Sequence, residues 1–122
     1  MRNDVVLALM IFLHIIDDFC LQGIMASMKQ KSWWQKDPIA AKPLYRHDYI
    51  AALLAHSFSW AFMTMIPTLI WGKWSFGILI SNMLLHAYID DMKANRGIIN
   101  LIADQSIHIG QILITWLFLV VI

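Results

Sequence analysis

The chain has 122 residues, of which 60% are hydrophobic and 14% are charged, and its mean hydropathy is +0.63. A net charge of +1 argues against nucleic acid as a partner, and a single cysteine excludes an intramolecular disulfide or a multi-cysteine metal site. A soluble domain usually has about a quarter charged residues, so the composition predicts a small integral membrane protein with one domain over residues 1–122.

Four apolar segments predict membrane-spanning helices, because each approaches the roughly 20 residues that cross a bilayer. The first is not expected to be a cleaved signal peptide, since its apolar run meets His14 and two aspartates instead of a small-residue cleavage site. The expected fold is therefore all-α, an integral membrane four-helix bundle in contact with the lipid bilayer. The segments run from Asp4 to Met25, Tyr49 to Trp71, Trp74 to Met92 and Ala103 to Ile122.

Residues 27–48 form a basic segment between the first two predicted helices. It holds more than half of the chain's nine basic residues, and tryptophan beside lysine is typical of a segment at the level of lipid headgroups. Two interpretations remain open: a solvated basic loop with interfacial aromatic side chains, or a flap over a pocket. The positive charge predicts that this segment and the loop with Lys93 and Arg96 face the cytoplasm. Both termini would then lie outside a multi-pass inner (cytoplasmic) membrane protein.

Three histidines in these segments each lie four residues from an aspartate, a spacing that places two side chains on one helix face. The helix directions also bring the three pairs and His56 to one depth, in the cytoplasmic half of the membrane. Because such groups are costly in an apolar bundle, their repetition predicts a shared polar pocket. The pairs are His14–Asp18, His86–Asp90 and Asp104–His108.

Imidazole and carboxylate groups without thiolates predict a divalent metal site, for Zn, Fe, Mn or Ni. Three or four ligands would hold one ion, whereas six or seven would hold two. A spare aspartate would act as the general base. The candidate metal ligands are His14, Asp18, His56, His86, Asp90, Asp104 and His108, and the candidate catalytic residues are Asp18, Asp90 and Lys93.

Individual residues also have purely structural interpretations. His56 alone fits a hydrogen bond between helices, and Lys93 fits a salt bridge with Asp90 at a helix end. Asp17 is expected to point away from the face shared by the pairs, as a local cap or a pocket edge. His47, in the basic segment, is expected to be a surface histidine.

The stretch His14-Ile-Ile-Asp17-Asp18-Phe19-Cys20-Leu21-Gln22 resembles the H-x-x-x-D-F-x-L-Q signature of DUF3307, a family of small bacterial and phage membrane proteins. Residues 86–93 resemble its H-x-x-x-D-x-x-K element, residues 104–108 resemble its D-Q-x-x-H element, and His56 falls where the family commonly has a histidine. Asp17 departs from the pattern, which has a small or apolar residue there. The resemblance implies a membrane architecture and a shared site, and it names no reaction.

The leading hypothesis is a membrane-embedded metal-dependent hydrolase, with Zn as the expected metal. Its substrate would be a lipid or a lipid-linked phosphate that enters from the cytoplasmic leaflet, where Lys93 and the basic segment would receive an anionic headgroup. One alternative is a proton- or ion-relay or transport protein, assembled as a homo-oligomer, although no inverted repeat is evident. Another is a non-catalytic membrane protein whose polar residues lock its helices together.

Overall fold

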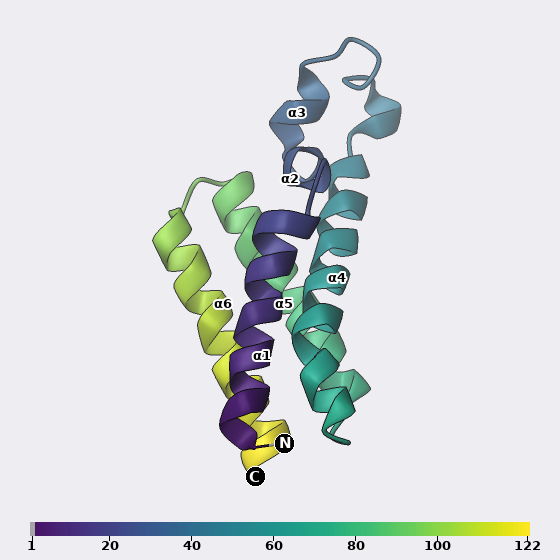
Figure 1. Cartoon of the computed structure of the whole chain (residues 1–122). Helices are drawn as coiled ribbons and strands as arrows, with labels where there is room; N and C mark the ends of the chain where they lie inside the picture. The colour runs from purple at the N-terminus through teal and green to yellow at the C-terminus, as the bar shows by residue number, and fades with distance from the viewer. Residues whose placement is uncertain (1) are drawn as a thin grey trace.

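The computed structural model describes residues 2–122, and this range contains helices and turns but no strand. Four long helices run alongside one another as a bundle, and two short helices stand at one end of it (Figure 1). The long helices are α1 (Asn3–Ile16, continued by a π-helical turn, Asp17–Leu21), α4 (Asp48–Ile70), α5 (Phe76–Ala94) and α6 (Leu101–Trp116, continued by a second π-helical turn, Leu117–Val121). The short elements are α2 (Met25–Met28), α3 (Lys31–Gln35) and a 3-10 turn, Pro43–Tyr45.

The predicted first helix is too long at its C-terminal end. It was expected to reach Met25, but the helical conformation ends at Leu21. Gly23 has a φ of +57°, a left-handed conformation that glycine adopts at little cost, and the chain there turns into α2. The starts of α5 and α6 follow from side-chain caps, since Ser75 accepts a hydrogen bond from the Ile78 N–H and Asn100 accepts one from the Ala103 N–H.

Helix α4 packs against both α1 and α5, and α6 closes the bundle against the same two helices. The N- and C-termini lie together at the end of the bundle opposite α2 and α3 (Figure 1). There the Trp116 indole N–H donates a hydrogen bond of 2.8 Å to the Asn3 carbonyl oxygen. The apolar core occupies this half of the bundle, around Met10, Trp60 and Ile112. The half next to α2 is left for polar side chains.

The surface of the bundle is apolar along its length. Phe12 is 56% exposed, Ile70 is 72% exposed and Phe118 is 64% exposed, whereas several histidines and aspartates are buried inside. Buried charged groups of this kind are uncommon in proteins unless they are paired.

Two helical segments are long and apolar enough to cross a membrane, Pro43–Ile70 and Leu101–Val121. The composition therefore supports two of the four predicted spans. The first helix with its π-helical turn and α5 have comparable length, but each carries three charged residues, which lowers its apolar character. These residues are Asp4, Asp17 and Asp18 in the first helix and Asp90, Asp91 and Lys93 in α5.

Candidate metal centre

The predicted metal ligands lie together inside the half of the bundle next to α2. Each long helix contributes at least one of them, so the site depends on the packing of all four. The four histidines, Asp90 and Asp104 are at most 1% exposed, and the Asp18 side chain is 7% exposed. The set comprises His14 on α1, Asp18 on the π-helical turn, His56 on α4, His86 and Asp90 on α5, and Asp104 and His108 on α6.

The π-helical turn Asp17–Leu21 directs two consecutive aspartates into the bundle. Adjacent residues of an α-helix point about 100° apart, so α-helical geometry predicts that only one of the two faces the interior. Instead Asp17 is 1% exposed, and it accepts a hydrogen bond of 2.6 Å from the Ser59 hydroxyl. Its Oδ2 lies 3.7 Å from His56 Nδ1. Asp17 therefore adjoins the site, contrary to the prediction that it would point away.

Four atoms form what we call the first group: Asp18 Oδ1, His56 Nε2, His86 Nε2 and Asp90 Oδ2. His56 Nε2 lies 3.1 Å from His86 Nε2, and it lies 3.3 Å and 3.4 Å from the Asp18 and Asp90 oxygens. His86 Nε2 lies 3.9 Å and 3.6 Å from the same two oxygens. Ligands at 2.0–2.2 Å from a tetrahedral zinc ion are about 3.3–3.6 Å from one another. The five distances given above are close to those of such a ligand set, and Asp18, His56 and His86 offer ligand atoms that all lie within 4.8 Å of one another.

Three atoms form the second group: Asp90 Oδ1, His108 Nε2 and Asp104 Oδ1. His108 Nε2 lies 3.3 Å from the Asp90 oxygen and 3.2 Å from the Asp104 oxygen. The His108 ring stacks on the His86 ring, with 4.0 Å between their centroids. The two groups therefore share the Asp90 carboxylate, which offers one oxygen to each.

Side chains behind the two groups orient their histidines. His108 Nδ1 lies 3.2 Å from Gln111 Oε1, and the Gln111 amide donates to the Asn82 carbonyl oxygen. Because Gln111 Oε1 only accepts, this network places a proton on His108 Nδ1 and turns Nε2 toward the site. Asp17 stands behind His56 in a comparable position. Metal-binding histidines are commonly held by such an acceptor on the far ring nitrogen.

His14 plays a different part, because both of its ring nitrogens are engaged. The Trp60 indole N–H donates to His14 Nδ1 at 2.7 Å, so the ring proton lies on Nε2, which is 3.0 Å from Gln105 Oε1. The Gln105 amide in turn donates to Asp18 Oδ2 and Asp104 Oδ2. His14 thus positions two carboxylates through Gln105, and it joins neither group.

Two lysines neutralise carboxylates of the cluster. Lys29, on the C-terminal side of α2, is 5% exposed and donates to Asp90 Oδ2 at 2.6 Å. Lys93 donates to Asp104 Oδ2 at 2.7 Å, so its partner is Asp104 and not Asp90 as the three-residue spacing predicted. No sequence pattern points to Lys29, because 61 residues separate it from Asp90. Lys29 thus brings one residue of the basic segment into the site.

The cluster contains excess negative charge. With neutral imidazoles, four buried carboxylates against two ammonium groups leave a net charge of −2. Asp18 Oδ1 and Asp104 Oδ1 are buried without a hydrogen-bond partner in residues 2–122, whereas buried polar atoms are almost always paired. A divalent cation would neutralise this charge and satisfy these oxygens. The charged groups are Asp17, Asp18, Asp90, Asp104, Lys29 and Lys93.

A small polar pocket of about 40 Å³ opens onto the cluster beside α2. It is large enough for water molecules but not for a whole lipid. Asp18, Asp90 and Gln105 line one part of it, and the two lysines line another. His47, the histidine of the basic segment, is exposed and lies outside the cluster, as predicted.

No curated protein and no solved structure matches this chain at a significant level. The sequence model of the family described as "Protein of unknown function (DUF3307)" matches residues 6–122. The match includes every residue of the two groups and their supporting side chains. It is also the family whose motifs the histidine and aspartate pairs resemble, and the chain therefore belongs to the DUF3307 family.

Proposed function

We propose that this protein is an integral membrane metal-dependent hydrolase that acts on a lipid-linked phosphate from the cytoplasmic leaflet. The observation that carries the proposal is the spacing of the first group, whose two imidazole nitrogens and two carboxylate oxygens lie 3.1–3.9 Å apart in the five pairs that include a histidine nitrogen. This spacing fits a tetrahedral divalent metal, for which Zn is the best match to a nitrogen and oxygen ligand set.

The membrane location is supported by the apolar exterior and by the two apolar spans. Helices α1 and α5 would cross with them, because their charged residues face the bundle interior or its ends and their outer surfaces are apolar. The basic segment would lie at the cytoplasmic face of the inner membrane, and both termini would lie outside. The site would then sit in the cytoplasmic half of the bilayer, one or two helical turns below the headgroups.

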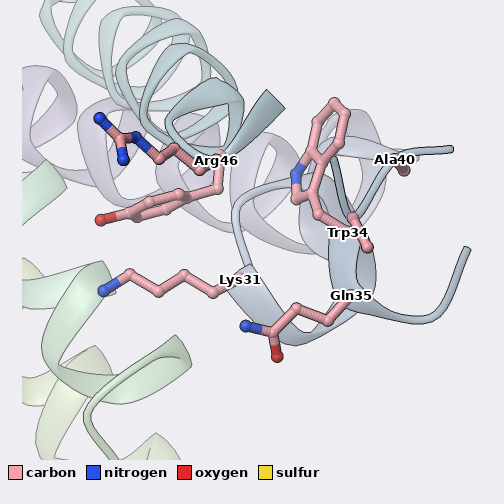
Figure 2. A pocket seen from close by; sticks show the side chains of 7 residues that line it. Lys31, Trp34, Gln35, Ala40 and Arg46 are labelled. Carbon is pink, nitrogen blue, oxygen red and sulfur yellow. The ribbon is translucent and has the colours of Figure 1, made fainter. Parts of the chain in front are cut away.

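The charge around the entrance supports an anionic substrate. Lys29 and Lys93 line the small pocket, and a phosphate that enters there would meet both ammonium groups. A second pocket of about 110 Å³ lies between α3 and the start of α4, where Figure 2 shows Lys31 and Arg46 extending in the same direction. Its lining contains no carboxylate, and the Lys31 ammonium lies 4.9 Å from the Tyr49 ring centroid. Such a surface suits an anionic headgroup.

A bound divalent cation would supply the Lewis acidity that polarises the phosphate. Residues of the chain would transfer the proton and stabilise the charge on the phosphate. A water oxygen forms a bond to phosphorus and gives a proton to Asp18 Oδ2, which at present accepts only the Gln105 amide. The phosphorus–oxygen bond to the lipid alcohol breaks, and the leaving oxygen takes that proton. Lys93 stabilises the charge on the phosphate oxygens. The products are the free alcohol and inorganic phosphate.

Phosphate release from polyprenyl phosphate or phosphatidic acid tests this function in the metal-loaded full-length protein. Removing a general base costs 10²–10⁴ in rate, so Asp18→Asn should lose at least about a hundredfold in kcat. His47→Ala removes an exposed histidine outside the cluster and should keep the wild-type kcat. A chelator should abolish phosphate release by both proteins. If the metal-loaded wild type releases no phosphate from either lipid, the hydrolase proposal is wrong. Proton or ion flux in liposomes would then favour the relay alternative.

A further inference from the structure

The Asp90 carboxylate faces two sets of ligand atoms, one with each oxygen. Oδ2 lies 3.4 Å and 3.6 Å from the Nε2 atoms of His56 and His86, and Oδ1 lies 3.3 Å from His108 Nε2. From this geometry we propose that the cluster is a binuclear centre, in which Asp90 bridges two divalent cations. The inference rests on the proposed metal-binding function and extends it to a second ion.

The second group offers three candidate ligand atoms beside His86, since His86, Asp90 and His108 offer ligand atoms that all lie within 4.8 Å of one another. Its three atoms have spacings of 3.2 Å and 3.3 Å around His108 Nε2, close to those of the first group. Gln111 Oε1 accepts from His108 Nδ1, so Nε2 is the ring atom that faces the two carboxylate oxygens. Either a proton on Nε2 or a metal ion can join an imidazole nitrogen to two carboxylate oxygens, and the second group has the atoms to bind the metal ion.

Asp104 gives independent support for a cation at this position. It is fully buried, and its Oδ1 has no hydrogen-bond partner in residues 2–122. Its other oxygen, Oδ2, is already satisfied by Lys93 and by the Gln105 amide. The side chain is therefore held by one oxygen, while the second lies 3.2 Å from His108 Nε2. A buried carboxylate oxygen with this orientation is suited to a metal ion.

The two groups adjoin each other, as two metal ions about 3.5–4 Å apart would require. The His86 and His108 rings, one from each group, stack at 28° with centroids 4.0 Å apart. Their Nε2 atoms face opposite oxygens of the same carboxylate. The geometry places the two candidate positions side by side.

The net charge of the cluster with two bound cations indicates which class of substrate it would bind. One divalent cation would bring the cluster from −2 to neutral, and a second would leave it at +2. A centre with that charge binds an anion such as a phosphate monoester, whose oxygens can contact both ions. The small pocket that would admit the phosphate is lined by Asp18, Asp90 and the two lysines, so it reaches both groups. A binuclear centre thus favours a terminal phosphate over a carboxylic ester as the substrate group.

Titration of the full-length protein with Mn²⁺, followed by electron paramagnetic resonance, tests the inference. We expect two bound ions per chain and the spectrum of an exchange-coupled pair, because a carboxylate bridge couples the two spins. His108→Ala should bind one ion and give the spectrum of an isolated ion, whereas His47→Ala should match the wild type. The wild-type spectrum decides the question even if His108→Ala fails to fold.

Each other result overturns a different claim. If the wild type saturates with one ion, the second site is wrong and the metal-binding proposal stands. If it binds two ions without coupling, the Asp90 bridge is wrong. If it binds neither Mn²⁺ nor Zn²⁺, the proposed metal-dependent function fails together with the binuclear centre.

Discussion

The Lys29 ammonium and the Asp90 carboxylate form an ion pair of 2.6 Å, with side-chain exposures of 6% and 2%. It ties the basic segment to α5 and places a cation on the carboxylate that both ligand groups share. Removing one partner of a buried pair leaves the other charge uncompensated, which costs about 3–5 kcal/mol.

Lys29→Met should therefore lower the thermal stability of the metal-free protein by an amount of this order. Metal should restore much of the loss, because a cation on Asp90 compensates the same charge. Thermal unfolding in detergent, with chelator and with Zn²⁺, measures both effects, and exposed Lys36→Met is the matched control. Equal losses for Lys29→Met with and without metal would contradict a metal at Asp90.

The variant His14→Ala tests whether His14 positions other side chains of the site or binds the metal itself. The change removes the acceptor of the Trp60 indole N–H and the donor to Gln105, and an unsatisfied buried group costs about 1–3 kcal/mol. We expect lower thermal stability with an unchanged number of bound metal ions per chain. Trp60→Phe should likewise destabilise without loss of metal. Loss of metal from His14→Ala but not from Trp60→Phe would make His14 a ligand.

The sequence predicted the site better than it predicted the contacts around it. The spacing of four residues and the helix directions were enough to bring His86, Asp90 and His108 to one layer, because both follow from helix geometry. Lys29 was missed, because its partner is remote in the sequence and a loop residue has no helical register. Asp17 was placed outside the site, because a π-helical turn changes the direction of its side chain and leaves no clear pattern in the sequence.

The end of the first helix and the role of His14 also differ in how far the sequence predicts them. Gly23 is a stop signal for the first helix, since glycine commonly follows a helix end, and the prediction extended the helix past it to Met25. The role of His14 depended on Trp60, a residue of another helix, so no local pattern in α1 contained it. Packing between helices therefore determines that His14, a predicted ligand, positions other side chains of the site.

The proposed topology predicts opposite accessibility for two exposed lysine positions. After Cys20→Ser removes the natural exposed thiol, Lys36→Cys should react with a membrane-impermeant reagent only from the cytoplasmic side. Lys73→Cys, in the turn between α4 and α5, should react only from outside. Labelling of whole cells and of inverted vesicles measures both. Reaction of position 36 in whole cells would mean that the orientation is reversed. Reaction of both positions from the same side would mean that α4, which lies between them, does not cross the membrane.

The basic pocket beside α3 should set affinity for the lipid and leave the chemical step unchanged. Each basic side chain near an anionic surface contributes about 1 kcal/mol, so Lys31→Gln combined with Arg46→Gln should raise KM about tenfold to thirtyfold. The kcat value and the bound metal should stay the same, because neither residue reaches the cluster. Steady-state kinetics with a lipid phosphate measures this, with exposed Lys42→Gln as the control. A fall in kcat at constant KM would contradict the proposal that this pocket binds the lipid headgroup.

Elemental analysis of the full-length protein, purified in detergent without chelators, tests the metal centre most directly. The wild type and His47→Ala should contain at least one equivalent of a divalent transition metal per chain. His86→Ala should lose the ion of the first group and retain its helical content, because the helices still pack through Met10, Trp60 and Ile112. A wild-type metal content well below one per chain, unchanged by His86→Ala and by addition of Zn²⁺, would contradict the account.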